Sequence, residues 1–362
     1  MNVLFDPNPF CFGSTSTMRA ILPWLPDASA RVLAVGSVHD LCDDLAVETL
    51  DVRDVSALRA RPDLLEWADV YVAVSNNTNV DTVCDAGVPL VFVDVLFWMK
   101  RGPTSAMRRA SAYLIENYPG VSERLAEFPV PNARRLGPII SGPTRVPSPD
   151  RPLMVNVGGA SSPDLRPGDN TSYPQRVVDL ADRIVAQRGW DPVDVTMGAT
   201  AARACQARPG ARPITLLQPV YLEQLGRSQV LLTSPGLNAP LEAFRAGVPV
   251  AWLPPQNLTQ VLHLKAYTDA GLAPSGLALD ELCSGFSVDA RAPESQGTAR
   301  VLQALAGLDP QAWEQVRRLV SAQLLALGRD PAPQRRRQWD WLEGLGPNGA
   351  SEAAQVIREV AR

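Results

Sequence analysis

The stretch QVLLTSPGLNAPLEAFRAGVPVAWLP, residues 229–254, decides the fold class of this chain. It begins with an apolar run that ends in a glycine turn, 229–236, and continues through a helical pattern, 238–246, to a second apolar run, 248–254. A strand, a helix and a strand in this order predict that the two strands pair in parallel. Ligands bind beyond the carboxyl ends of such strands, so functional residues are expected in the loops that follow them.

The same alternation continues on both sides of this stretch. The other strands that the sequence predicts are 3–5, 32–35, 70–74, 90–93, 153–159, 193–198 and 214–219, and the other helices are 14–24, 172–189 and 258–270. Short β-branched runs that alternate with helices are typical of doubly wound parallel sheets. The fold class predicted is therefore α/β, with two such sheets and a helical C-terminal tail, because the pattern becomes all-helical from about residue 294.

A proline-rich run separates the two halves. Residues 138–152, PIISGPTRVPSPDRP, contain five prolines, and proline fixes φ and removes a hydrogen-bond donor. The run is therefore interpreted as a linker. The predicted organisation is an N-terminal domain over 1–137, the linker 138–152, a second domain over 153–330, and C-terminal helices over 331–362.

The composition excludes several classes of protein. The chain has 34 Lys and Arg against 38 Asp and Glu, and no basic stripe, so a nucleic-acid partner is not expected. It has no run of 18 apolar residues and no secretory signal at its start, and its five cysteines are scattered. A cytoplasmic protein with reduced thiols and no transmembrane segment is therefore expected.

The segment from Ser234 to Pro254 resembles the donor-binding segment of the GT-B glycosyltransferases, most closely the family of the N-acetylglucosaminyltransferase that makes lipid II. That family shows a Ser/Arg-x-Gly-x-x-Thr-x-x-Glu run, a Gly-x-Pro turn, a strand that ends in proline, and then a glutamine, which is Gln260 here. His263 stands where the family usually has asparagine, so the chain departs from the pattern there. The resemblance covers about residues 153–275 and is only architectural over 1–137. It implies two Rossmann-like domains, an active site in the cleft between them, and a UDP-linked sugar donor.

The residues of this segment also suit a nucleotide-sugar donor on physical grounds. Gly236 precedes a helix, and a helix N-terminus with a glycine beside it lets a diphosphate approach free N–H groups closely. Ser234 and Asn238 flank this glycine. Glu242 follows about one and a half turns later and, as the resemblance implies, its carboxylate would hold the ribose diol. The alternative is a turn glycine followed by a solvated glutamate.

Four further loops are candidate donor contacts. Gly158 and Gly159 either contact phosphate or form a tight turn, and Gly198 lies where such families line the donor site. The backbone at Gln218 and Val220 would suit a uracil edge, or it forms an ordinary turn from strand to helix. Gly13 and Ser14 lie in a segment that loosely resembles the glycine-rich first loop of GT-B proteins, with one glycine and no histidine. A helix N-cap at Ser14 explains this loop equally well.

The first half is expected to bind the acceptor and to supply the catalytic base. Asp94 is the first candidate base and His39 the second, because each follows a predicted strand; a capping or surface role is the alternative for both. The asparagines at 76, 77 and 79 indicate polar recognition in one loop. The run 87–98 looks like a segment of the cytosylglucuronate synthase family, which implies cytosine and glucuronate chemistry in secondary metabolism. Phe97 and Trp98 would then stack on a flat acceptor, or they are core residues.

These features predict an inverting, metal-independent glycosyltransferase that acts on a small acceptor, since no Asp-x-Asp motif occurs. No cofactor is expected beyond the nucleotide-sugar donor, which is a substrate. A nucleotide-sugar 2-epimerase of the same fold is the first alternative, although it needs several carboxylates and a histidine, and this chain has two histidines. A non-catalytic homologue that binds a nucleotide-sugar is the second.

Overall fold

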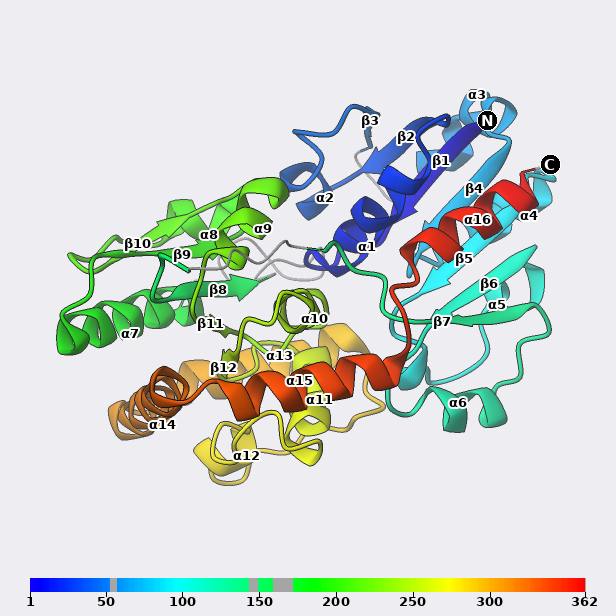
Figure 1. The fold of residues 1–362 in the computed structure, drawn as a ribbon. Coiled ribbons are helices and arrows are strands. Elements are labelled where there is room, and N and C mark those ends of the chain that lie inside the picture. The colour runs from blue at the N-terminus through cyan, green and yellow to red at the C-terminus, as the bar shows by residue number, and fades with distance from the viewer. Residues whose placement is uncertain (53–56, 143–148, 159–171, 362) are drawn as a thin grey trace. The chain divides into compact units, whose positions relative to one another are not determined.

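The computed structural model describes residues 1–52, 57–142, 149–158 and 172–361, which divide into two compact units (Figure 1). Unit 1 comprises Met1–Ser141 and Glu343–Arg362, and unit 2 comprises Gly142–Leu342. The first boundary falls inside the predicted linker, 138–152. The second falls inside the helix α15 (Ala332–Leu345), so the predicted segment of C-terminal helices, 331–362, is not a unit of its own.

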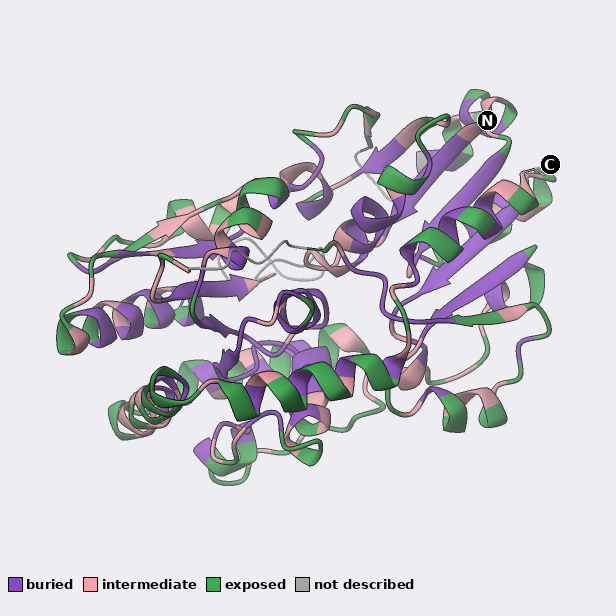
Figure 2. Ribbon diagram, in the orientation of Figure 1, coloured by how far each residue is buried: buried purple, intermediate pink, exposed green. Residues whose placement is uncertain are grey.

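Unit 1 is built on a parallel sheet. Within the described residues it has seven strands in the order β3-β2-β1-β4-β5-β6-β7. Their bounds are β1 Asn2–Pro7, β2 Ser29–Ala34, β3 Glu48–Asp51, β4 Val70–Val74, β5 Leu90–Asp94, β6 Ala112–Glu116 and β7 Ala133–Leu136. The strands β4, β5 and β6 are buried at every residue (Figure 2), as expected for apolar strands in a parallel sheet covered on both faces.

The helices of unit 1 are mostly short. They are α1 Gly13–Ile21, α2 Ser37–Asp40, α3 Pro62–Trp67, α4 Val80–Asp85, α5 Ser105–Arg109, α6 Val121–Glu127 and α16 Ala350–Val360, with the 3-10 turns η1 Leu22–Trp24, η2 Ala57–Ala60 and η3 Phe97–Met99. The helix α16, red in Figure 1, packs on α1 and on β4, β5 and β6. The chain that leads to α16 passes so close to Gly137 that a Cβ there would lie 1.7 Å from the carbonyl oxygen of Pro347.

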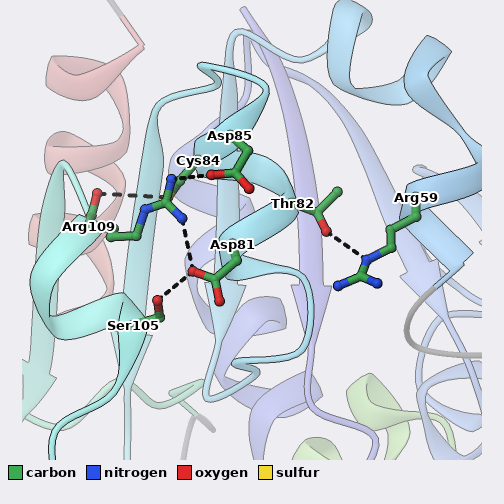
Figure 3. Close-up of polar contacts among 7 residues, drawn as sticks. All are labelled: Arg59, Asp81, Thr82, Cys84, Asp85, Ser105 and Arg109. Atoms are coloured by element: carbon green, nitrogen blue, oxygen red, sulfur yellow. Dashed lines mark hydrogen bonds and ion pairs between the residues drawn. The ribbon is translucent and has the colours of Figure 1, made fainter.

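An exposed polar cluster links α4 to α5 (Figure 3). Arg109 binds Asp81 at 3.0 Å and Asp85 at 2.6 Å, and the Ser105 hydroxyl donates to Asp81 at 2.5 Å. Exposed ion pairs contribute little to stability because water screens them. The cluster therefore connects two surface helices.

Unit 2 has a second parallel sheet, with five strands among the described residues, in the order β10-β9-β8-β11-β12. The strands are β8 Met154–Gly158, β9 Val193–Met197, β10 Ala211–Ile214, β11 Leu231–Thr233 and β12 Val250–Trp252. The helices, besides α15, are α7 Ser172–Arg188, α8 Ala199–Ala204, α9 Gln218–Gly226, α10 Asn238–Arg245, α11 Leu258–Asp269, α12 Leu279–Leu282, α13 Glu294–Gly307 and α14 Pro310–Arg329. The apolar face predicted for α7 joins the core, which includes Val177, Ala181 and Ile184.

The fold class predicted from the sequence is confirmed, with differences in detail. The strand predicted over 214–219 is wrong in position: β10 ends at Ile214, and α9 begins at Gln218. Pro219 stands in the first turn of α9, where its missing N–H is not needed. The strands β3, β6 and β7 are additional to those predicted. No helix in the described part of the chain is long and apolar enough to cross a membrane, and none of the five cysteines forms a disulfide with another described residue.

Candidate functional site

The strand order of unit 2 places a topological switch point between β8 and β11. From β8 the chain proceeds through β9 to β10, and it then returns to the other side of β8 as β11. Ligands of open parallel sheets bind at the carboxyl ends of strands at such a point. Two of the predicted glycines belong here, because Gly158 ends β8 and Gly236 follows β11.

A buried hydrogen-bond network holds the two strand ends together. The Asn156 side-chain oxygen accepts from the Gly158 N–H at 3.0 Å. The Ser234 hydroxyl lies 3.1 Å from the hydroxyl of Tyr173 and accepts from Gln256 at 3.3 Å. Ser234 is 2% exposed. Its buried side chain therefore helps to hold the turn after β11 in place. A direct contact between this side chain and a ligand remains a prediction.

Both glycines face open space. A Cβ at Gly158 or at Gly236 would meet no described atom within 4 Å. Gly158 has φ +70°, in the region that favours glycine, whereas Gly236 has an ordinary φ. The backbone conformation thus favours glycine at 158, while at 236 no described atom occupies the space that a side chain would fill. Gly159 lies outside the described residues.

The helix α10 begins just after Gly236. Its N-cap is Leu237, which makes no side-chain capping bond within the described structure. The leading N–H groups of a helix have no acceptor inside the helix and carry the positive end of its dipole. Asn238 is its first residue and is 9% exposed. The N-terminus of α10 is thus compatible with the anion contact expected there, which stays a prediction.

Glu242 is the most informative side chain of the predicted set. It lies on α10, is 3% exposed, and its Oε1 has no hydrogen-bond partner among the described residues. Burial raises the pKa of Glu242 to about 8. The alternative of a solvated surface glutamate is therefore wrong. A buried acceptor without a partner is costly and calls for an explanation.

The first turn of α9 contains Gln218 and Val220, whose backbone is predicted to contact the nucleobase. Gln218 is its first residue and is buried, whereas Val220 is 40% exposed, as is Leu217 at 41%. Two exposed apolar side chains lie here beside helical backbone amides. Gly198 is the N-cap of α8, at the carboxyl end of β9. The predicted nucleobase contact at Val220 is compatible with this arrangement.

Gln260 and His263 lie on α11 and are buried at 6% and 1% exposure. The Gln260 side-chain oxygen accepts from the Gln256 N–H at 3.0 Å, which ties α11 to the network at the switch point. His263 stacks on Tyr267, with ring centroids 6.1 Å apart. Burial lowers the pKa of His263 to about 3, so its imidazole is neutral. The histidine that departs from the family pattern is a core side chain.

Unit 1 has its own switch point, between β1 and β4, and here the structure reveals a residue that the sequence analysis missed. Asp6 is the penultimate residue of β1 and is 3% exposed. It accepts hydrogen bonds from the Tyr71 hydroxyl, from Asn76 at 2.8 Å and from Asn79 at 2.9 Å. Burial raises the pKa of Asp6 to about 6, against the lowering effect of these three donors. The predicted asparagine loop thus binds a carboxylate of the protein itself. The polar cluster 76–79 was the signal that could have pointed to it.

Gly13 and Ser14 are the first two residues of α1, whose N-cap is Phe12. Phe12 makes no side-chain capping bond within the described structure, so the capping interpretation of Ser14 is wrong. Ser14 is 5% exposed. The next residue, Thr15, is fully buried, and its hydroxyl has no partner in the described part of the chain.

The two predicted bases are in different surroundings from those expected. Asp94 is 1% exposed and ion-paired: its Oδ2 accepts from the Tyr113 hydroxyl at 2.5 Å and lies 3.0 Å from the Lys100 ammonium. Its carboxylate is therefore engaged by internal donors and is not open at the edge of the sheet. His39, on α2, has a half-exposed side chain 3.3 Å from the exposed Asp51. These contacts do not show that either Asp94 or His39 is a catalytic base.

The strand β6 ends in a further buried carboxyl that was not predicted, Glu116. It is 1% exposed; its Oε1 accepts from the Ile139 N–H, and its Oε2 has no partner among the described residues. Burial raises the pKa of Glu116 to about 8. Phe97 is fully buried against Tyr113, as the core alternative expected, and Trp98 packs on Tyr118.

No protein-family model matches the sequence, and no curated protein matches it. Solved structures do match along the whole chain. UGT2 of Phytolacca americana, solved with UDP-2fluoro-glucose and pterostilbene, is 14% identical with a TM-score of 0.55, and the match covers 100% of both chains. The glycosyltransferase SnogD of Streptomyces nogalater is 17% identical at 0.54, covering 100% of this chain and 99% of that one. A Listeria monocytogenes protein described as a UDP-N-acetylglucosamine 2-epimerase is 14% identical at 0.57, covering 99% and 94%. These similarities establish the fold.

Proposed function

We propose that this chain is a glycosyltransferase that moves a sugar from a nucleotide-sugar to a small acceptor. The observation that carries the proposal is Glu242, a buried carboxyl with an oxygen that has no hydrogen-bond partner among the described residues. It lies on a helix whose N-terminus follows Gly236, where no described atom fills the space of a Cβ. A nucleoside diphosphate supplies the two groups that such a site lacks, an anion and a pair of hydroxyls.

The diphosphate would bind at the N-terminus of α10, with the backbone at Gly236 and Gly158 close to it. The helix dipole and the leading N–H groups stabilise negative charge there. Negative charge grows on the diphosphate as the bond to the sugar breaks, so the same groups would stabilise the transition state. This arrangement is the basis for proposing a reaction that needs neither a metal ion nor a further cofactor.

The nucleoside would extend from the diphosphate towards α9. Glu242 would bind the ribose hydroxyls, and the exposed side chains of Leu217 and Val220 offer an apolar surface for a base. Backbone N–H and C=O groups in the first turn of α9 suit a uracil edge, which favours a UDP-sugar.

The acceptor and the base are assigned to unit 1. The base removes the proton of the acceptor nucleophile, which attacks the anomeric carbon from the face opposite the departing diphosphate and so inverts its configuration. Asp94 and His39 remain the predicted bases. A cytosine or glucuronate type of acceptor in secondary metabolism is the finer proposal, from the run 87–98.

Thermal-shift measurements with UDP, TDP, GDP and ADP sugars test the donor class. A ligand that binds only the folded protein raises the melting temperature by mass action. We expect a UDP-sugar to raise it and to release UDP in a turnover assay with added acceptors. A shift without any turnover or hydrolysis would favour the non-catalytic homologue, and no shift with any nucleotide sugar would contradict the proposal.

A nucleotide-sugar 2-epimerase is the second candidate. It is favoured by three buried carboxyls at strand ends of one sheet, Asp6, Asp94 and Glu116, and by the Listeria monocytogenes fold similarity. Incubation with UDP-N-acetylglucosamine and no acceptor separates the two. An epimerase would produce the C2 epimer, visible by NMR, whereas a transferase would leave the donor unchanged or hydrolyse it slowly.

A further inference from the structure

One buried glutamine connects the ends of three strands of unit 2. Gln256 follows β12 and is 1% exposed. Its side-chain Nε2 donates to the Val157 carbonyl oxygen, on β8, at 2.5 Å, and to the Ser234 hydroxyl, after β11, at 3.3 Å. The pairing of β8 with β11 extends as far as Asn156 and Thr233. The Gln256 side chain therefore joins the two chain segments at the first position beyond that pair.

The directions of the hydrogen bonds in this network follow from the number of hydrogens available. The Tyr173 hydroxyl donates its one hydrogen to the Pro254 carbonyl oxygen at 2.6 Å. In its 3.1 Å contact with the Ser234 hydroxyl, the hydrogen therefore comes from Ser234. Ser234 in turn accepts from Gln256, whose second side-chain N–H is used on Val157. Removal of any donor in this series leaves a buried acceptor unpaired, which is costly.

The network ends at the two turns that are proposed for the diphosphate. Val157 directly precedes Gly158 in the sequence. Beyond Ser234, the Gly236 N–H donates back to the Ser234 carbonyl oxygen at 2.7 Å. Neither glycine has a side chain that could fix its turn. Backbone groups bind a ligand well only when their positions are held, because a displacement of about 1 Å can cost about 100-fold.

We propose that Gln256 is a positioning residue for the diphosphate. Through Val157 and Ser234 it sets the separation of the two glycine turns, and so the fit of the site to this group. This inference rests on the proposed function. A purely structural residue would alter stability and leave the relative affinities for different ligands unchanged. Gln256 should instead affect the binding of the diphosphate and not that of the nucleoside.

Titration of the full chain with UDP and uridine tests the inference, because the ratio of the two affinities reports what the diphosphate adds. Gln256→Met keeps the length of the side chain and removes both donors. It should lower the UDP-to-uridine affinity ratio at least about 10-fold, with uridine affinity unchanged. Tyr173→Phe removes one hydroxyl of the network and should lower the same ratio about 3-fold. This milder variant gives the same test if Gln256→Met does not fold.

Gln323→Met is the matched control. Gln323, on α14, is a second glutamine that binds the sheet of unit 2. Its side-chain oxygen accepts from the Trp252 N–H at 2.9 Å, and its Nε2 donates to the Trp252 carbonyl oxygen at 3.2 Å. Both bonds are to the edge strand β12, and neither is to a glycine turn. The variant should therefore lower the melting temperature and leave the affinity ratio unchanged.

An unchanged ratio in the folded Gln256 and Tyr173 variants would overturn the inference and leave the proposed function intact. So would an equal fall in the ratio for Gln323→Met, because the ratio would then follow stability. The diphosphates ADP, GDP and TDP with their nucleosides repeat the comparison for other bases. Absence of binding by the wild-type protein to every one of these nucleotides would instead overturn the proposed function, and the inference with it.

Discussion

Each of the two sheets has a buried carboxyl near its switch point, but the hydrogen bonding of these two carboxyls differs. In unit 1, Asp6 receives three hydrogen bonds, from Tyr71, Asn76 and Asn79. In unit 2, Glu242 has an oxygen that no described residue approaches as a donor. Both carboxyls are almost fully buried, so burial alone does not separate them. What separates them is whether the protein completes their hydrogen bonding itself or leaves it for a ligand.

The pKa values follow the same contrast. Burial raises both, but the three donors hold the pKa of Asp6 at about 6, whereas burial acts alone on Glu242 and brings its pKa to about 8. A donor from a ligand would therefore stabilise the ionised form of Glu242 in the way that the asparagines stabilise Asp6.

The largest expected effect concerns the open turn of unit 2. Gly236→Val should weaken UDP binding at least about 1000-fold, or roughly 4 kcal/mol, because the side chain would occupy the approach to α10. Uridine binding should be largely retained, since uridine has no diphosphate. Titration with UDP and uridine measures both. Gly102→Val, at another open glycine in unit 1, is the control for folding and should bind UDP normally. Normal UDP binding by Gly236→Val would move the diphosphate elsewhere.

Asp6→Asn should disrupt the hydrogen bonds at the switch point of unit 1 and so lower the stability of the protein. The new amide turns a donor towards Asn76 or Asn79, which are donors themselves, so a loss of about 3 kcal/mol in the free energy of unfolding is expected. Denaturant unfolding at pH 7.5, where the carboxyl is ionised, measures it. UDP affinity should not change. A variant as stable as the wild type would mean that the three hydrogen bonds do not hold this sheet edge together.

Glu242→Gln should weaken UDP binding without lowering the stability of the protein. The Oε1 of Glu242 has no hydrogen-bond partner among the described residues, so the melting temperature should stay the same or rise, while UDP binding weakens by about 2–3 kcal/mol. Scanning calorimetry and titration on one preparation measure both quantities. A destabilised variant with unchanged UDP affinity would assign Glu242 to the core and remove it from the site.

The smallest effect is a pH dependence at Glu116. Its pKa is raised in the folded state, from an ordinary 4.5 to about 8, so the folded protein binds this proton more tightly than the unfolded chain does. Stability from this group is therefore greatest at low pH and falls as pH rises through this window. Between pH 5.5 and 7 the loss should be about 2 kcal/mol, and Glu116→Gln should remove it. Unfolding measured across this range tests the slope, and the exposed Glu66→Gln should keep the wild-type profile.

Much of the fold could be predicted because its signals are local. The strand β4 was predicted with its observed bounds, since five apolar residues lie between polar ones. The strand β7, by contrast, has the sequence ARRL, which contains no apolar run, and its pairing with β6 depends on the rest of the sheet. The misplaced strand at 214–219 shows the same limit, because an apolar run there continues past the end of β10 into the start of a helix.

For the candidate site, the sequence could predict only the residues that belong to a local pattern. Gly236 and Glu242 could be predicted as candidates because a glycine turn and a helix position carry a pattern along the chain. Asp6 was missed because its partners are 65 or more residues away, and only the pairing of β1 with β4 brings them together.

The return of residues 343–361 to unit 1 affects the order in which the chain can fold. Unit 2 is, in effect, inserted between β7 and α16, and α16 supplies Ala353, Val356 and Ile357 to the core of unit 1. During synthesis the N-terminal domain of a protein usually folds first. Here the strands of unit 1 emerge first but remain without α16 until all of unit 2 has been made. A nascent chain would therefore complete unit 2 before α16 can pack on α1 and on the earlier sheet.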